Sequence, residues 1–260
     1  MLIDPKAAKV RGVAKLTKKD ARSSTGLFLL EGPQGLKEAL DRPKLIVELY
    51  ATEDAVERYS ELFDRAESAR ILVQLVSEPV LKALTDTTTP QGVVAVCQQL
   101  DVTLDDIIAA KPQLVALLAN IRDPGNAGTV LRAADAAGAD AVIFSQNSVD
   151  AYNPKVVRST TGSLFHLPFV LDAPIEETIN ALKAAGMQVF AANGGGQAIP
   201  DLPKDTLAKP TVWVFGNEAW GFEPETLELV DQEVAVPIYG AAESLNLATA
   251  ASICLYASAF

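Results

Sequence analysis

The second half of the chain alternates short apolar runs with segments of helical length. Apolar runs typical of buried strands lie at 114–119, 141–145, 187–192, 211–215 and 233–237. Helix-like segments lie at about 127–137, 154–160, 175–185, 224–230 and 245–259. Strands separated by helix-sized segments indicate a mostly parallel sheet that helices cover on both faces. The sequence therefore predicts an α/β domain over 113–260.

The first hundred residues show a second, smaller alternation. Strands are expected at 26–31, 45–51, 71–76 and 93–97, with helices at about 34–40, 53–66 and 78–84. This pattern predicts a separate three-layer α/β unit over 1–100. Residues 101–112, which carry an acidic pair and end at Pro112, are the candidate linker between the two domains.

The composition favours a globular protein without metal or disulfide. The chain has 260 residues, of which 49% are hydrophobic, so each domain can bury a core. No apolar run reaches the ~18 residues needed to span a bilayer, and no apolar segment follows the first positive charges as in a secretory signal. Cys97 and Cys254 lie far apart in apolar runs, so we expect buried free thiols in a reducing cytoplasm. The single histidine, His166, lacks neighbours that would complete a metal site.

The charge of the chain is unevenly distributed. The net charge is −11, which argues against nucleic-acid binding by the whole surface. Residues 1–22, however, hold seven cations and two carboxylates, a local net charge of +5. This segment is either a solvated lysine-rich helix or a basic arm that contacts phosphates. The candidate RNA contacts in it are Lys15, Lys18, Lys19 and Arg22.

An unusually polar turn follows the apolar run 114–119. It reads Asn-Ile-Arg-Asp-Pro-Gly-Asn-Ala-Gly-Thr-Val-Leu-Arg over 120–132 and leads into an alanine-rich helical pattern. Asn126 is expected to be the N-cap of that helix. Arg132 lies roughly 140° from the helix's apolar stripe at ~100° per residue, so we expect it to face solvent or a cleft. Alone, the turn is equally compatible with a capped surface helix that carries an arginine.

Two later turns resemble the first in their position after a strand. Residues 212–221 run from a strand into a glycine-bracketed turn that carries Glu218, and residues 236–251 pass through a loop with Ser244 and Asn246 into a helix. Each is weak evidence alone. Because all three polar turns follow strands of one predicted sheet, we expect them to converge on one site. The triple glycine 194–196 is expected to be a loop, and it lacks the spacing of a dinucleotide-binding loop.

These three stretches resemble the three motifs of the SpoU/TrmH family of RNA ribose 2′-O-methyltransferases, in the SPOUT superfamily. The first matches at Asn120, Asp123-Pro124, Asn126, Gly128 and Arg132, the second at Gly216, Glu218 and Gly221, and the third at Pro237, Gly240 and Ser244-Leu245-Asn246. An intermediate segment of the family is similar at Arg158, Gly162, Phe165 and Leu167-Pro168. More loosely, Phe28, Glu31-Gly32 and Thr89-Pro90-Gln91-Gly92 resemble a substrate-binding domain that precedes the catalytic domain in rRNA-directed members.

The resemblance implies a fold and an activity. The expected fold is α/β: a SPOUT domain, whose parallel sheet carries a deep trefoil knot, preceded by a smaller α/β RNA-binding domain. The expected protein is a cytoplasmic homodimer that uses S-adenosyl-L-methionine to methylate RNA, with 23S rRNA favoured by the extra N-terminal domain. Methylation of tRNA, a role in antibiotic resistance and a non-catalytic RNA-binding protein on a degenerate fold are the alternatives.

The resemblance also assigns roles to residues. The implied catalytic residues are Arg132, Asn126, Glu218, Ser244 and Asn246, and the implied cofactor-binding residues are Gly216, Asn217, Gly221, Ile238, Gly240, Leu245 and Leu247. Gln91 and Arg158 join the candidate RNA contacts. A guanidinium with a pKa above ~12 is a poor base, so Arg132 is expected either to grip an RNA phosphate that accepts the proton or to stabilise the developing alkoxide. Both roles stay open at this stage.

Overall fold

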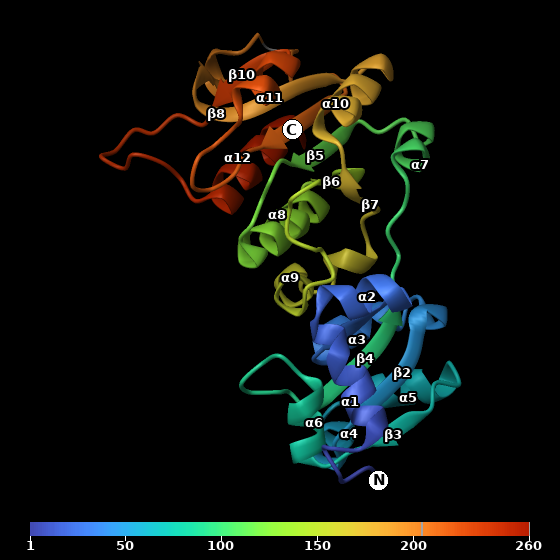
Figure 1. The fold of residues 1–260 in the computed structure, drawn as a ribbon. Helices are drawn as coiled ribbons and strands as arrows, with labels where there is room; N and C mark the ends of the chain where they lie inside the picture. The colour runs from blue at the N-terminus through green and yellow to red at the C-terminus, as the bar shows by residue number, and fades with distance from the viewer. Residues whose placement is uncertain (204, 260) are drawn as a thin grey trace. The chain divides into compact units, whose positions relative to one another are not determined.

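The computed structural model describes residues 1–203 and 205–259, and these form two compact units. Unit 1 contains Met1–Leu100 and Tyr152–Phe165, and unit 2 contains Asp101–Ala151 and the described residues from His166 onward. Figure 1 labels the elements. None of the helices in the described ranges combines the length and the apolar character that a membrane span requires.

Unit 1 is a four-stranded mixed sheet with helices on both faces. Its strands are β1 (Leu27–Glu31), β2 (Ile46–Ala51), β3 (Val73–Leu75) and β4 (Val93–Gln98), in the order β1-β4-β2-β3. Its helices are α1 (Ala8–Ala14), α2 (Lys19–Thr25), α3 (Pro33–Ala39), α4 (Glu53–Arg58), α5 (Ser60–Ser68), α6 (Glu78–Leu84) and α9 (Pro154–Thr160). Short 3₁₀ turns lie at Lys15–Thr17, Pro43–Leu45 and Ser163–Phe165. Strand β4 runs antiparallel to both β1 and β2.

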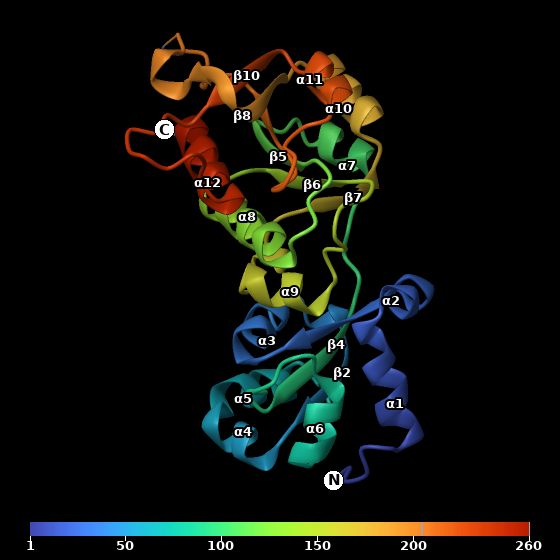
Figure 2. The same ribbon diagram turned by 60° about the vertical axis from the view of Figure 1, so that its left-hand side comes forward.

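The core of unit 1 explains its three layers. Helices α1 and α6 pack on one face of the sheet, where Val10, Val13, Val80, Leu81 and Leu84 meet apolar side chains of β1, β2 and β4. Helices α3, α4 and α5 lie on the opposite face (Figure 2). The predicted three-layer arrangement is therefore present, although the expected helix over 53–66 is divided at Tyr59.

Unit 2 contains a six-stranded sheet in which every pairing is parallel. Its strands are β5 (Leu114–Leu118), β6 (Ala141–Ser145), β7 (Phe169–Ala173), β8 (Gln188–Ala198), β9 (Thr211–Phe215) and β10 (Gln232–Ala235), in the order β10-β8-β9-β5-β6-β7. Its helices are α7 (Leu104–Ala109), α8 (Pro124–Ala136), α10 (Ile175–Ala184), α11 (Pro224–Leu229) and α12 (Leu247–Ala259), with a 3₁₀ turn at Ile199–Asp201.

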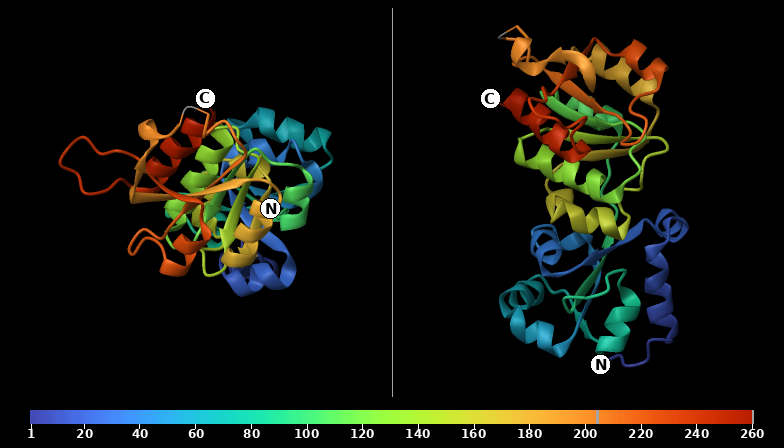
Figure 3. Two further views of the ribbon diagram at one scale, coloured as in Figure 1. Left: turned by 90° about the horizontal axis from the view of Figure 1, so that it is seen from above. Right: turned by 90° about the vertical axis from the view of Figure 1, so that its left-hand side faces the viewer.

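Helices cover both faces of the parallel sheet, as predicted. Helices α8 and α12 pack together on one face; they are the yellow-green and red helices in the right panel of Figure 3. On the other face, Ile107 of α7 and Ile179 and Leu182 of α10 are buried against strands β5, β8 and β9. The strands are apolar on both faces because neither face meets water, which explains their uninterrupted hydrophobic runs.

The structure differs from the expected elements at several positions. Residues 101–112 are not a bare linker, because Thr103 and Asp106 form a capping box that starts helix α7. Strand β8 continues through the triple glycine 194–196, which was expected to be a loop. Strand β7 was not predicted, since it is an edge strand whose pairing with β6 is interrupted. The expected strands at 141–145 and 211–215 are correct to the residue.

The segment 152–165 lies within the sequence expected to belong to the C-terminal domain, yet it packs with unit 1. Tyr152 and Phe165 stack on Phe28 of β1, with ring centroids 4.8 and 6.3 Å apart. Arg158 of the same segment forms an ion pair with Glu31, its Nη1 lying 3.0 Å from Oε2. Aromatic burial and this ion pair therefore hold the segment against β1.

Candidate functional site

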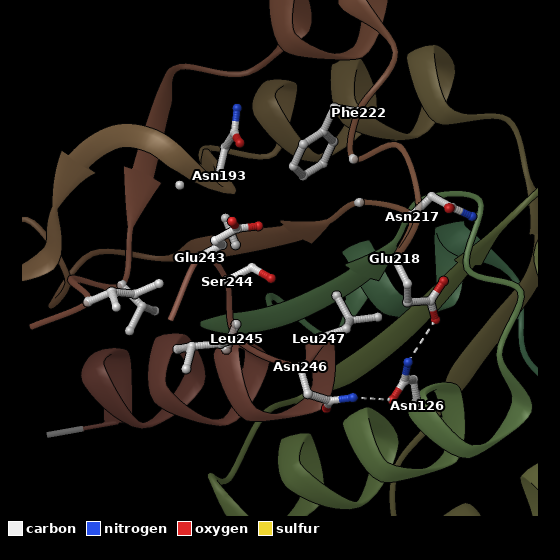
Figure 4. Close-up of a pocket in the computed structure, with 17 residues that line it drawn as sticks. Asn126, Asn193, Asn217, Glu218, Phe222, Glu243, Ser244, Leu245, Asn246 and Leu247 are labelled. Atoms are coloured by element: carbon white, nitrogen blue, oxygen red, sulfur yellow. Dashed lines mark hydrogen bonds between the residues drawn. The ribbon is translucent and has the colours of Figure 1, made fainter. Parts of the chain in front are cut away.

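A cavity of about 470 Å³ opens in unit 2, beside the middle of β8, beyond the end of β9 and around the chain that follows β10. The polar turns expected to converge all contribute to it, the first through Asn126 alone. The turn after β9 supplies Gly216, Asn217, Glu218, Gly221 and Phe222, and the chain from β10 to α12 supplies Val236, Ile238, Glu243, Ser244, Leu245, Asn246, Leu247 and Ala250. Figure 4 shows this lining. The convergence follows from the parallel sheet, because the carboxyl ends of its strands share an edge.

Asn126 connects the three turns. Its Nδ2 donates a hydrogen bond to Oε1 of Glu218 at 3.1 Å, and its Oδ1 accepts one from Nδ2 of Asn246 at 3.0 Å (Figure 4). The expectation that Asn126 caps helix α8 is wrong. Asp123 is the cap, and its carboxylate accepts the backbone N–H of Asn126 at 2.7 Å. Proline at the first helical position favours this earlier start.

Asn246 is a second connecting residue. Helix α12 begins at Leu247, two residues later than expected, because Oδ1 of Asn246 accepts the backbone N–H of Ala248 at 2.9 Å. The amide group of Asn246 remains available to Asn126. One side chain thus caps the helix and joins its start to the first turn.

Asn217 holds the second turn in shape. Its side chain is buried, and its Nδ2 donates to the carbonyl of Asn120 at 2.7 Å. Its Oδ1 accepts the N–H of Ala219, and its backbone exchanges two hydrogen bonds with Gly221 at 2.8 and 2.9 Å. Asn120 has a left-handed φ of 56°, a conformation that asparagine tolerates better than most residues. The turns after β5 and β9 are therefore fixed to each other.

Gly216 has a steric reason to be glycine. A Cβ at this position would lie 2.8 Å from the carbonyl oxygen of Gly221 and 3.0 Å from the ring of Phe222. The backbone of the second turn could not close over a larger residue without shifting. Gly216, Asn217 and Gly221 of this turn all line the cavity.

Strand β8 supplies residues that sequence reasoning missed. Ala192, Asn193 and Gly194 line the cavity, and Nδ2 of Asn193 donates to Oε2 of Glu233 at 2.7 Å. A polar residue directly after the predicted strand 187–192 was the available signal. Phe222, Glu243, Val236 and Ala250 were also missed; no motif distinguished them.

Arg132 and Gly240 do not line the cavity. Arg132 is exposed on α8, about 9 Å along the helix axis from Asn126 at ~1.5 Å per residue. Every other residue expected to be catalytic or cofactor-binding is part of the lining. The first motif therefore contributes to the wall of the cavity through Asn126.

The candidate RNA contacts lie in unit 1. Lys15, Lys18 and Lys19 are exposed, but Arg22 is only 2% exposed and its Nη1 donates to the carbonyl of Leu16 at 2.8 Å. Arg22 is therefore not an RNA contact on the surface. Its guanidinium instead stabilises the turn between α1 and α2. Gln91 and Arg158 line a separate cavity of about 430 Å³ together with the threonine-rich loop 85–89.

The expected cysteine chemistry is present. Cys97 and Cys254 are free and buried, and burial raises the pKa of each thiol to about 12. The single histidine, His166, lies beside Asp135, with Nδ1 2.8 Å from Oδ2. Across the described residues, no group of three or more His, Cys, Asp or Glu side chains could hold a metal ion.

Comparison with known proteins yields two family matches. Residues 113–256 match the SpoU rRNA Methylase family, and residues 29–103 match the domain described as RNA 2′-O ribose methyltransferase substrate binding. A curated relative, the 23S rRNA (guanosine(2553)-2′-O)-methyltransferase RlmP of Bacillus subtilis (strain 168), is 36% identical over 252 residues, covering 96% of each chain.

Solved structures resemble the whole chain. The AdoMet-bound rRNA methyltransferase from Sinorhizobium meliloti has a TM-score of 0.85 and 31% identity, covering 99% of this chain and 96% of its own. The SpoU methyltransferase AviRb from Streptomyces viridochromogenes, in complex with the cofactor AdoMet, has a TM-score of 0.82 and 28% identity, covering 97% and 98%. Both units thus have counterparts in solved proteins.

Proposed function

The chain belongs to the SpoU rRNA methylase family, and from this premise we propose that it is an S-adenosyl-L-methionine-dependent RNA (ribose-2′-O)-methyltransferase acting on 23S rRNA. The observation that carries this proposal is the hydrogen-bonded group Glu218–Asn126–Asn246 on the wall of the cavity. It joins residues of all three family motifs at one place, next to backbone groups of the Gly216 turn.

The cavity suits the cofactor by size and by lining. Its volume of about 470 Å³ is within the range of small-molecule sites. Leu245, Leu247 and Ile238 provide apolar wall, and the close turn at Gly216 presents peptide groups that can bond polar parts of a ligand. When bound there, S-adenosyl-L-methionine would supply an electrophilic methyl group on a sulfonium.

The residues around Asn126 position the RNA acceptor in this proposal. Methylation forms a bond from the ribose 2′-oxygen to the methyl carbon, breaks the carbon–sulfur bond and passes the hydroxyl proton either to the RNA phosphate that Arg132 would grip or to water. Glu218 can accept a hydrogen bond from the 2′-hydroxyl, while Asn126 keeps that carboxylate in one orientation. Ser244 adds a hydroxyl to the same wall. Orientation of this kind can supply much of an enzyme's acceleration.

We further propose a homodimer in which Arg132 acts on RNA near the subunit interface. Exposed apolar side chains gather on α12 and the loop before it: Ile238, Tyr239, Leu245, Ile253 and Tyr256. Such residues are typical of interfaces between subunits. Because Arg132 does not line the cavity of its own chain, it would act on the RNA phosphate or the developing alkoxide from outside that cavity or from the partner copy.

Mixing two impaired variants distinguishes these positions. Arg132→Ala and Asn126→Ala chains, co-expressed with different tags, form heterodimers. If Arg132 serves the partner's cavity, each heterodimer regains one intact site, and a random mixture recovers about a quarter of wild-type activity. If it serves its own chain, the mixture shows no more than the mean activity of the two variants. Full activity of Arg132→Ala alone would remove Arg132 from the mechanism.

The basic segment of unit 1 is proposed to contact RNA phosphates. The exposed lysines Lys15, Lys18 and Lys19 carry this role, whereas Arg22 does not. Replacing the three lysines by glutamine should weaken RNA binding and reduce the slope of log affinity against log salt by about 2 to 3. An unchanged slope would exclude these lysines from the contact.

The whole proposal is tested by cofactor and product. Calorimetry should detect S-adenosyl-L-methionine binding to the purified protein. A methyl-transfer assay on unmodified transcripts of 23S rRNA and of tRNA, followed by mapping of 2′-O-methyl sites, should then show transfer to 23S rRNA alone. Transfer to tRNA would overturn the proposed substrate, and absence of cofactor binding would overturn the proposed activity.

We also propose a cytoplasmic location, where ribosomal RNA is processed, and a trefoil knot in the segment that returns from β10 to α12.

A further inference from the structure

Trp220 is an exposed aromatic residue beside the proposed acceptor position. It is 52% exposed and lies in the turn after β9, two residues after Glu218. The hydrogen-bonded pairing of Asn217 with Gly221 closes that turn on either side of it. Backbone hydrogen bonds thus fix the base of the turn, and the ring of Trp220 at its tip is exposed to solvent. Trp220 is not one of the buried residues that form the core of unit 2.

Arg122 stands over the Trp220 ring. Its guanidinium carbon lies 5.1 Å from the ring centroid, within the range of a cation–π contact. Arg122 comes from the turn after β5 and is itself exposed. Two turns that already meet at the Asn217–Asn120 hydrogen bond therefore also meet through a cation and an aromatic ring. The guanidinium restrains the ring from one face, and the exposed fraction of the ring is left for another partner.

We propose that Trp220 is the platform on which an unpaired base of the substrate RNA stacks while its ribose is methylated, with Arg122 orienting the ring and adding positive charge for the backbone. Aromatic rings accept bases of any sequence because every base has a π-face. Glu218 at the cavity wall and Trp220 at the tip of the same short turn would then grip one nucleotide by its ribose and its base. This inference rests on the proposed function and concerns RNA binding alone.

The two tryptophans of the chain make the proposal measurable without catalysis. Trp213 is fully buried in β9, where its Nε1 donates to Oγ of Ser258 at 2.9 Å, so acrylamide should quench only Trp220. An unmodified 23S rRNA transcript should quench the exposed component and protect it from acrylamide. The Trp220→Phe variant should lack this component altogether, which assigns the signal.

Kinetics supply the second readout. Trp220→Leu should raise KM for the transcript about 10- to 100-fold, with kcat and cofactor affinity within a few-fold, because one stacked base is lost. Trp220→Phe, which keeps an aromatic face, should remain within a few-fold of wild type. Arg122→Gln should raise KM by less than Trp220→Leu, and the double variant should raise KM by less than the product of the two single effects, since part of the role of Arg122 is to orient the ring. Lys111→Gln is the matched control, because it removes one positive charge from an exposed residue of unit 2, as Arg122→Gln does.

Several results would overturn the proposal. An unchanged KM in Trp220→Leu would exclude stacking, and loss of cofactor binding in that variant would assign Trp220 to the cavity wall instead. Protection of Trp220 that grows with protein concentration in the absence of RNA would show that a second copy covers the ring. If the wild-type protein transfers no methyl group, the proposed function fails, yet quenching by the transcript still reports whether RNA reaches Trp220.

Discussion

Replacing Asn126 by alanine should separate activity from stability. The substitution removes two side-chain hydrogen bonds, to Glu218 at 3.1 Å and from Asn246 at 3.0 Å, and leaves the Asp123 cap of α8 in place. Glu218 and Asn246 are exposed, so water can replace the lost partners in the ground state. We therefore expect the free energy of unfolding to fall by less than about 1 kcal/mol.

The effect on methyl transfer should be larger. A hydrogen bond contributes roughly 0.5–1.5 kcal/mol net, so loss of both weakens the orientation of Glu218 and of the α12 turn by about 1–3 kcal/mol. If that orientation is needed in the transition state, kcat/KM falls about 5- to 150-fold, at a tenfold change per ~1.4 kcal/mol. Cofactor affinity should change less, because Gly216 and the apolar wall are untouched.

Asn126→Asp adds a sharper version of the same test. It keeps an acceptor for Asn246 but replaces the donor to Glu218 by a second carboxylate. Two like charges about 3 Å apart in water repel by roughly 1.3 kcal/mol, so activity should fall about tenfold below that of the alanine variant. Glu218 would turn away from its position at the cavity.

The assay is methyl transfer to an unmodified 23S rRNA transcript, with urea unfolding and cofactor calorimetry on the same preparations. Asn180→Ala, an exposed change of the same type on α10, is the matched control and should behave as wild type. The reasoning is refuted if Asn126→Ala retains full kcat/KM. It is equally refuted if unfolding free energy and activity fall in proportion, since the residue would then be structural.

Three further outcomes follow from the structure. Gly216→Ala should weaken cofactor binding at least tenfold in calorimetry, because the added Cβ lies 2.8 Å from a carbonyl oxygen of the same turn; unchanged affinity would exclude that turn from the site. Cys97 and Cys254, with pKa values of about 12, should resist thiol reagents in the native protein at pH 8, where the thiolate fraction is ~10⁻⁴, and react on unfolding; rapid native labelling would contradict their burial. Hydrogen bonds from Thr103 lower the pKa of Asp106 below 3.8, so this contribution to stability is present above the unfolded pKa and is lost as pH falls through the lower, folded value; the stability gap between wild type and Asp106→Asn in urea unfolding should therefore close at acidic pH.

The parallel sheet and its converging turns could be predicted because each depends on local pattern. The run at 141–145 is apolar without interruption and is bounded by polar residues, so it reads as a buried strand of that length. Once the strands are parallel, the turns that follow them must share an edge. The sequence could therefore predict that Asn126, Glu218 and Asn246 lie close together. It could not predict the hydrogen bonds between them.

Features that depend on distant partners could not be predicted. The triple glycine 194–196 reads as a loop, yet it continues β8, and a Cβ on Gly196 would lie 2.3 Å from the backbone of Glu233 in β10. Nothing in the sequence distinguishes Arg22 from the other cations of residues 1–22. In the structure, however, it is the one cation of that segment that is buried, with its guanidinium bonded to a backbone carbonyl. The packing of 152–165 on β1 depends on an aromatic contact across more than a hundred residues of sequence.

The asparagines of the site share a division of roles that explains why amides, and not carboxylates, occupy these turns. Asn217 and Asn246 each use the oxygen to accept an N–H of their own turn and the amide to donate to a neighbouring turn. Asn126 makes both of its side-chain bonds to other turns, and it can do so because Asp123 caps the helix in its place. A carboxylate would keep the cap at Asn246 but could not donate to Asn126. The turns are therefore held together by groups that must be donor and acceptor at once. The carboxylate of Glu218 stands at the end of the side-chain series Asn246–Asn126–Glu218, where its second oxygen can meet a substrate hydroxyl.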